Sequence, residues 1–333
     1  MPHLDWTNEY QRKATLKDVA KLAGVSPITV SRFVNTPSSV SDTTAKKIMD
    51  AIEQSGYVPN AAARQLKTSE SNVVYFVVPS IKNRLYASIS HELMLFLSGF
   101  GKSLFICEYN FQDEIEDMLI LEIIKHRPAA IIIASGDGMK ISVMNFLRAS
   151  KIPVIQFDRV NNKIDCVATI ELDNFHGGKL AGEYLINKGV KEIYVLSVNT
   201  KRVFESRIDG LKSAASEYSV KVNIVNSDFN FRDRNDSYTI DLTGNTGYFL
   251  LNSDIANSFL TKNTTVMTQV LAERIISFDK IINSDFIPFK IATINYDMSE
   301  FVREITQKLD DIFKQVRTEQ SKSVIPVNII YNP

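Results

Sequence analysis

The sequence predicts an α/β protein in which a small helical headpiece precedes a larger unit of two lobes, each built on a parallel β-sheet. Three observations lead to this expectation. Two closely spaced helical patterns with a turn signal between them occur near the N-terminus. From Val73 onward, short apolar runs alternate with amphipathic stretches, the pattern of parallel α/β sheets. The alternation forms two successive series, so it predicts two lobes.

The first two predicted helices form a helix-turn-helix. Ser26 suits the N-cap of the second helix, and Pro27 suits its first turn, where no backbone donor is needed. Gly24 ends the first helix. The apolar residues of that first helix share one face: Leu16, Val19, Ala20 and Ala23. Two helices joined by so short a turn are typical of DNA-reading modules, although a protein-binding helical module has the same outline.

The second predicted helix begins with short polar side chains followed by an arginine. Thr29, Ser31 and Arg32 could approach base edges and phosphates in a major groove. Its core-facing residues are Val30, Phe33 and Val34.

A third helix is expected to begin after Ser41, as N-cap, and to run to Gly56. Its apolar residues close a three-helix core: Ala45, Ile48, Met49 and Ile52. The helix-turn-helix domain is therefore expected to span residues 15–58.

A hinge follows at residues 59–70. The run from Asn60 to Lys67 makes about two helical turns, too few to be stable alone in water, so it needs a partner to fold. Residues 1–14 form an N-terminal arm without the apolar core of a signal peptide. No run reaches the length of a membrane span, and we expect a cytoplasmic protein with no membrane contact. Residues 71–333 make up the two-lobed domain.

These motifs resemble those of the lactose/galactose repressor family (LacI/GalR type), and the similarity covers nearly the whole chain, most strongly up to Lys67. The resemblance implies a homodimer on double-stranded operator DNA, with a hinge helix that folds only on that DNA. It also implies that Leu66 wedges between base pairs in the minor groove. The candidate DNA-binding residues are Pro27, Ile28, Thr29, Ser31, Arg32, Asn35, Thr44, Asn60, Ala63, Arg64, Leu66 and Lys67.

The distribution of charge supports a DNA-reading N-terminus. The chain has 38 basic and 38 acidic side chains, so its formal net charge is zero. Between Arg12 and Lys67, however, nine lysines and arginines face four aspartates and glutamates. This segment therefore has a positive net charge, and the remainder of the chain has a negative net charge of the same size. Such a distribution is expected for a DNA-binding domain attached to a control module.

The rest of the chain repeats a strand and helix rhythm in two series. The last elements are expected to pass between the lobes more than once, which gives a hinged clamshell like that of periplasmic sugar-binding proteins. The predicted strands are Val73–Val78, Leu104–Cys107, Ala130–Ala134, Val154–Phe157, Ile193–Ser197, Val222–Val225, Tyr248–Leu251, Ile275–Phe278, Ile291–Ile294 and Val324–Ile330.

Ligands in such sheets bind beyond the carboxyl ends of the strands, so polar residues at those ends are the candidates for an effector site. Carboxylates and an arginine in one cleft suit a polyhydroxylated ligand, because they bind vicinal hydroxyls through paired hydrogen bonds. The alternative is a purely structural role, in which the aspartates cap loops and Arg207 pairs with a surface carboxylate such as Asp209. The candidate effector-binding residues are Asp158, Arg207, Phe231, whose ring could stack on a sugar, Asp254 and Asp279.

The family resemblance extends to this site. Arg207 matches the family's arginine ahead of a glycine, and Asp279 matches the aspartate that ends its glycine-aromatic-aspartate strand. The chain departs from the pattern at Ser277, at Asn252 to Asp254, at Tyr296 and in the irregular stretch 228–247. The run Gln156 to Arg159 resembles the sucrose-regulon repressors of this family. The effector implied is a sugar or sugar phosphate.

Other functions remain as alternatives. The sequence has no phosphate-binding glycine loop, no nucleophile elbow and no histidine placed with a cysteine or serine, so no catalysis is expected. Cys107, Cys166 and the four histidines lack ligand spacing, so we expect no metal, cofactor or disulfide. A catabolite regulator with a phosphorylated carrier protein as partner, a purine-activated repressor and a transport-type sugar-binding protein are the alternatives.

Overall fold

A computed structural model describes residues 14–58, 71–197, 202–226, 245–281, 289–316 and 319–331. The chain divides into two compact units, residues 1–70 and 71–333. Nearly all of the predicted N-terminal arm and the whole hinge at 59–70 lie outside the described residues, so both stay predictions.

The first unit contains the predicted helix-turn-helix. Its helices are α1 (Leu16–Ala23), α2 (Pro27–Asn35), a short 3-10 turn η1 (Pro37–Ser39) and α3 (Asp42–Ser55). Gly24 ends α1 in a left-handed conformation, with φ of +66°. Ser26 caps α2, because its Oγ accepts a hydrogen bond from the backbone N of Thr29 at 3.1 Å. The predicted end of α1 and start of α2 therefore act as expected. Ser41 occupies the predicted N-cap position of α3, but its side chain makes no capping hydrogen bond.

The core of the headpiece differs from the prediction at one position. Val19, Ala20, Val30, Ile48 and Ala51 are buried, whereas the side chain of Met49 is 59% exposed. On α3, Ile48 and Ala51 are three residues apart and share a face, and Met49 lies next to that face rather than on it. The prediction of Met49 as a core residue is wrong.

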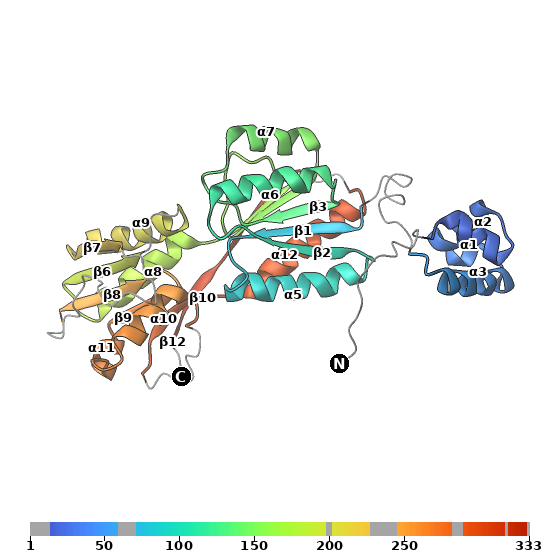
Figure 1. The fold of residues 1–333 in the computed structure, drawn as a ribbon. Helices are drawn as coiled ribbons and strands as arrows, with labels where there is room; N and C mark the ends of the chain where they lie inside the picture. The colour runs from blue at the N-terminus through green and yellow to red at the C-terminus, as the bar shows by residue number, and fades with distance from the viewer. Residues whose placement is uncertain are drawn as a thin grey trace, which may run out of the picture. The chain divides into compact units, whose positions relative to one another are not determined.

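The first lobe of the second unit is a six-stranded parallel sheet (Figure 1). Helices α6 (Asp113–Lys125) and α7 (Ile141–Ser150) cover one face, and α5 (Arg84–Ser98) and α12 (Met298–Phe313) cover the other. The strand order is β11 (Ser321–Ile325), β5 (Ala168–Leu172), β4 (Val154–Phe157), β3 (Ala130–Ile133), β1 (Val73–Val78) and β2 (Ser103–Glu108).

The second lobe repeats this plan. Helices α8 (Asn174–Asn187) and α9 (Arg202–Glu217) pack together, and α10 (Ser253–Lys262) packs on two central strands, with α11 (Gln269–Ala272) nearby in sequence. All neighbouring strands are parallel except Ala292–Tyr296 and Val327–Tyr331, which pair antiparallel. The strand order is β12 (Val327–Tyr331), β10 (Ala292–Tyr296), β9 (Ile275–Phe278), β8 (Thr246–Leu250), β6 (Glu192–Ser197) and β7 (Lys221–Asn226).

The chain passes between the lobes after β5, after β10 and after β11. The expected repeated crossing is thus confirmed, but the single strand predicted at Val324–Ile330 is wrong. Pro326 separates β11, which joins the first sheet, from β12, which joins the second. Proline has no backbone donor for a ladder, which explains the break at this position.

β5 and α10 also differ from the prediction. β5 was not expected, because its residues alternate between buried and partly exposed and include Thr169 and Glu171. α10 was not expected either, although Asn252 caps it by accepting a hydrogen bond from the N of Ile255 at 2.8 Å. The stretch 228–247 was expected to be irregular, yet β8 begins at Thr246. The rest of that stretch up to residue 244 lies outside the described residues.

Candidate functional site

A pocket between the two lobes brings four of the predicted effector-binding residues together. Asp158 comes from the first lobe, and Arg207, Asp254 and Asp279 come from the second. The cavity volume is about 80 Å³. Phe231 lies outside the described residues. The other lining residues are Asn83, Leu85, Tyr86, Phe111, Arg159, Phe204, Asn252 and Tyr296.

Close packing of α8 against α9 positions Arg207. A side chain at Gly178 would overlap the backbone carbonyl of Arg207, and one at Gly210 would overlap the carbonyl of Phe175. Only glycine lets the two helix backbones approach so closely. These glycines therefore fix where the start of α9, with Arg207, meets the pocket.

Arg207 is buried, with 3% of its surface exposed, and its guanidinium is held from several sides. Its Nε donates a hydrogen bond to Oδ1 of Asn174 at 2.8 Å, and its Nη1 donates one to the carbonyl of Leu251. The guanidinium carbon lies 3.4 Å from the centroid of the Phe278 ring. Burial lowers the pKa of Arg207, and the charge of Asp279 opposes this. The alternative in which Arg207 pairs with Asp209 on the surface is wrong.

Asp158 and Asp279 directly follow strands β4 and β9 and line the pocket from opposite lobes. The hydroxyl of Tyr86 donates a hydrogen bond to Oδ2 of Asp158 at 2.6 Å. Burial raises the pKa of Asp158, although the Tyr86 hydrogen bond and Arg207 oppose the shift. Burial also raises the pKa of Asp279 to about 6, and Arg207 again opposes it. Burial therefore makes both carboxyls costly to ionise.

Arg159 and Phe111 complete the first-lobe wall. The Nη1 of Arg159 donates to the hydroxyl of Tyr109 at 3.4 Å, and its guanidinium carbon lies 5.7 Å from the centroid of the Phe111 ring. The Tyr109 hydroxyl in turn donates to the carbonyl of Ala134 at 2.8 Å. The exposed Phe111 ring, 48% of whose surface is accessible, thus stands beside a fixed cation.

Sequence reasoning missed several lining residues that the strand-end rule would have found. Asn83 and Tyr86 follow β1, Phe111 follows β2, and Tyr296 ends β10. Phe204 had no such signal, because it precedes Arg207 on a helix.

The pocket can bind hydroxyl groups through three carboxylates and two guanidiniums, with aromatic rings beside them. Carboxylates accept from sugar hydroxyls, guanidiniums donate to them, and ring faces cover apolar C–H surface. Among the described residues, no group of three or more histidine, cysteine or acidic side chains could hold a metal ion.

The headpiece exposes the predicted reading surface at the start of α2. Pro27, Ile28 and Arg32 are exposed, with 71% of Ile28 accessible, while Thr29 and Ser31 are partly exposed. The hydroxyls of Thr29 and Thr44 lie 2.8 and 2.9 Å from those of Ser26 and Ser41. Asn35 is the last residue of α2. The candidate hinge contacts lie outside the described residues: Asn60, Ala63, Arg64, Leu66 and Lys67.

Two family models match this chain. Residues 15–60 match the model of bacterial regulatory proteins of the lacI family, and residues 74–246 match the periplasmic binding protein domain. The transcriptional repressor PurR of Mannheimia succiniciproducens is 34% identical over 214 residues, which are 63% of each chain. The sucrose operon repressor of Lactococcus lactis is 33% identical over 214 residues, 63% of this chain and 65% of that one. The matches thus span less than two thirds of either relative.

Solved structures share the fold. A lacI-family transcriptional regulator from Silicibacter pomeroyi superposes with a TM-score of 0.80 at 19% identity, over 96% of this chain and 98% of that one. The lac repressor dimer bound to operator and an anti-inducer superposes with a TM-score of 0.73 at 20% identity and the same coverage. Within the described residues, no helix is long and apolar enough to cross a membrane. The predicted fold class and resemblance are confirmed: the chain joins a helix-turn-helix domain of the lacI family of bacterial regulatory proteins to a periplasmic binding protein domain.

Proposed function

We propose that this chain is a sequence-specific DNA-binding repressor whose affinity for its operator is lowered by a carbohydrate bound between the lobes. One observation carries the proposal most directly. A helix-turn-helix with an exposed α2 start is joined in one chain to a clamshell whose pocket gathers Asp158, Arg207, Asp254 and Asp279. A ligand that binds one conformation of the clamshell more tightly than the other can thereby change the DNA affinity of the attached helix-turn-helix domain.

The charges in the pocket favour a sugar over a strongly anionic ligand. Three carboxylates line it against two arginines, and Arg207 already donates to Asn174 and to the carbonyl of Leu251. The hydroxyls of a neutral polyol can donate hydrogen bonds to these carboxylates, whereas a phosphate would be repelled by their negative charge. Repression of sugar-utilisation genes fits the relative named sucrose operon repressor.

The proposed repressor acts as a homodimer on a near-palindromic operator in the bacterial cytoplasm. The proposal includes no catalytic step. A two-fold dimer supplies two copies of α2 for two half-sites. The lac repressor, which shares the fold, was solved as a dimer on its operator.

The proposal is tested by a thermal-shift screen of neutral sugars and sugar phosphates, followed by operator binding with the hits. A bound ligand raises the melting temperature by mass action. Operator binding should weaken steeply with salt, with a slope near −5 or steeper for about six phosphate contacts per dimer. A sugar that stabilises the protein but leaves operator affinity unchanged would refute the regulatory role.

A purine-activated repressor is the second candidate. Four aromatic side chains line the pocket, namely Tyr86, Phe111, Phe204 and Tyr296, and flat rings can stack on a base. The relatives named PurR are as similar as the sucrose operon repressor. Adding purine bases to the same screen separates the two, since a purine that raises operator affinity would replace the sugar proposal.

A further inference from the structure

Glu116 is a buried acidic residue that does not line the pocket described above. It lies in the first turn of α6, and 0% of its surface is exposed. The backbone N of Gly136 donates to both of its carboxyl oxygens, at 3.1 Å each. A buried carboxylate keeps its charge only when a cation or several hydrogen bonds compensate the lost water. One shared backbone donor is little compensation, so this carboxyl is a candidate for binding a proton.

Two carboxyls of α6 lie against the loop after β3, residues 135–140. A Cβ at Gly136 would lie 2.8 Å from Oδ1 of Asp113 and 2.9 Å from Oε2 of Glu116. A Cβ at Gly138 would overlap the carboxyl of Asp113. Both carboxyls therefore approach the same point beside Gly136, and two negative charges at this point would repel each other.

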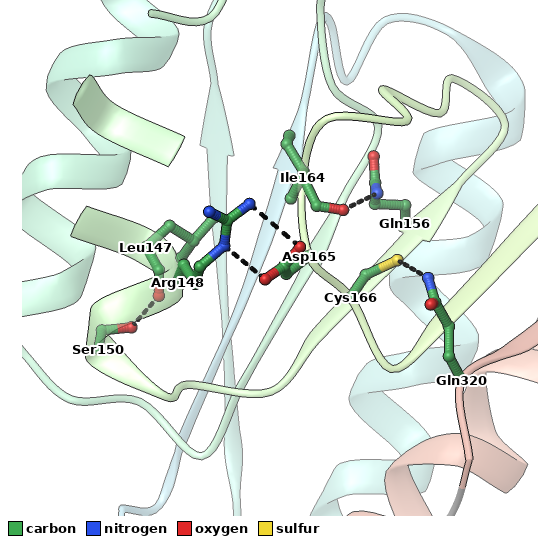
Figure 2. A network of polar contacts seen from close by, with 8 residues as sticks. All are labelled: Leu147, Arg148, Ser150, Gln156, Ile164, Asp165, Cys166 and Gln320. Atoms are coloured by element: carbon green, nitrogen blue, oxygen red, sulfur yellow. Dashed lines mark hydrogen bonds and ion pairs between the residues drawn. The ribbon is translucent and has the colours of Figure 1, made fainter. Parts of the chain in front are cut away.

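The carbonyl side of the Gly136 peptide is held by buried amide side chains. This carbonyl accepts a hydrogen bond from Nδ2 of Asn161 at 3.1 Å. The backbone N of Asn161 donates to Oε1 of Gln156 at 2.8 Å, and Nε2 of Gln156 donates to the carbonyl of Ile164 at 3.3 Å (Figure 2). These contacts attach one side of the loop to β4 and the segment after it, whereas its attachment to α6 depends on Glu116 and its neighbours.

The two ends of the loop are attached to α6 in different ways. At the far end, the backbone N of Lys140 donates to Oδ1 of Asp117 at 3.1 Å, and the ammonium nitrogen of Lys140 lies 3.4 Å from Oδ2. A hydrogen bond and an ion pair therefore hold this end. At the near end, Gly136 meets Glu116 and Asp113, which carry the same charge when both are ionised. The near end is thus the weaker one whenever Glu116 loses its proton.

The electrostatic surroundings of Glu116 favour its protonated form up to neutral pH. Burial raises the pKa of the Glu116 carboxyl to about 7, although hydrogen bonds from the loop and the charge of Arg159 oppose this rise. Burial also raises the pKa of Tyr109, so its hydroxyl stays neutral in this range. The titratable and polar groups that face Glu116 are Asp113 on α6, Ser135 and Gly136 in the loop, Tyr109 after β2 and Arg159 after β4.

We propose that the loop of residues 135–140 is a pH-sensitive wall of the cleft between the lobes, held against α6 while Glu116 carries a proton and loosened when the proton leaves. A second cavity between the lobes, of about 340 Å³, is lined by Ser135 and Asp137 of this loop and by Phe175 of α8. Proton release places a second negative charge beside Asp113 and weakens the near end of the loop. The inference goes beyond the proposed function, because it requires no ligand.

The first test compares the wild-type and Glu116→Gln full chains by urea unfolding at about pH 4 and about pH 8. Glutamine still accepts from the N of Gly136 but cannot ionise. The folded wild type holds the proton up to a pKa of about 7, and the unfolded chain releases it near pH 4, so wild-type stability falls as pH rises between these values. The folding equilibrium constant of the wild type relative to the variant should therefore fall about 100-fold.

The matched control is Glu114→Gln, in the same turn of α6. Glu114 is exposed, so the stability of this variant relative to the wild type should change little with pH. Asp279 also titrates, but it does so in all three proteins, and its effect cancels in the ratios. A ratio of wild type to Glu116→Gln that stays constant with pH overturns the proposal.

The second test follows the loop itself by hydrogen exchange. Protection factors for residues 135–140, corrected for the pH dependence of intrinsic exchange, measure how often the loop opens. Protection should fall about tenfold between about pH 6 and about pH 8 in the wild type and stay within about twofold in Glu116→Gln. Equal wild-type protection at both pH values overturns the proposal even if the unfolding test succeeds, because Glu116 would then titrate without moving the loop. An equal fall in the variant would assign the change to other groups and contradict the proposal as well.

Discussion

Asp158 and Asp279 hold equivalent places in the two lobes. Each follows a phenylalanine at the end of the third strand of its sheet, β4 or β9. Each has a left-handed backbone, with φ of +56° for Asp158 and +68° for Asp279. Each donates its backbone N–H to the neighbouring strand, to Ile170 at 2.8 Å and to Ile294 at 3.0 Å. The same turn thus presents one carboxylate from each side of the pocket, at a cost of about 1 kcal/mol or more each.

Asp279→Asn should increase stability while removing the response to sugar. Asparagine tolerates the left-handed backbone and keeps the shape of the side chain. It removes the Asp279 carboxyl, whose pKa is raised to about 6 by burial. We expect the free energy of unfolding at pH 7 to rise by about 1 to 3 kcal/mol in urea titrations. Arg207→Ala would be a poorer test, because it also leaves Asn174 and the Leu251 carbonyl without their donor. A destabilised Asp279→Asn variant would show that the carboxylate is stabilising.

The pH dependence of stability and of sugar binding should have opposite signs. The folded state keeps a proton on Asp279 up to a pKa of about 6, whereas the unfolded chain releases it near pH 4. Stability of the free protein should therefore fall as pH rises between these values. Sugar affinity should instead fall as pH drops, since only about a tenth of Asp279 is ionised at pH 5. Calorimetry at pH 5 and 7 measures this, and Asp279→Asn should flatten the profile.

Gly178→Ala should disturb the pocket by displacing Arg207, although Gly178 itself does not line the pocket. The added carbon would overlap the carbonyl of Arg207 and force α8 away from α9, which we expect to cost about 2 kcal/mol or more. Sugar affinity should fall because Arg207 is displaced. Gly99→Ala is the control: Gly99 has φ of −63°, and a side chain there would meet the Phe96 carbonyl at 3.4 Å. Thermal unfolding of both variants measures the difference, and equal melting temperatures would refute the role of close packing.

Leu66→Ala tests the hinge that the family resemblance implies. Removing the wedge side chain should reduce operator bending and lower specific affinity by about 1 to 3 kcal/mol, while non-specific binding survives. Gel-shift bending assays with the wild-type chain as reference measure both effects. Unchanged bending would show that Leu66 does not enter the base stack.

The strand-end rule found Asp158, Asp254 and Asp279 because the carboxyl ends of parallel strands meet at one edge. Arg207 lies on α9 and was indicated by the family's arginine ahead of a glycine. Alternation of apolar runs likewise predicted most strands to within a few residues. Packing between helices is harder to predict. The environment of Arg207 depends on two glycines whose neighbours, Arg207 and Phe175, are 29 and 35 positions away along the chain. The β11–β12 break depended on Pro326, a signal present in the sequence but not used.

The aromatic part of the pocket shows a second limit. A phenylalanine in sequence is most often a core residue, and nothing local to Phe111 or Phe175 announces that its ring stays exposed in a cavity. Phe111 lies in the left-handed turn after β2, and the backbone of Phe175 lies where α8 closely approaches α9. Such features depend on tertiary structure, so sequence reasoning did not select these two rings. Its own candidate, Phe231, lies outside the described residues and stays a prediction.

The most direct test of the account measures operator affinity of the full chain with and without a saturating sugar from the screen. We expect operator affinity to fall by about 5- to 150-fold, the usual range of coupling between two sites. Asp279→Asn should bind operator as tightly as the wild type without sugar and should show no fall. Operator affinity that does not change on saturation with every sugar that binds the cleft would contradict the account.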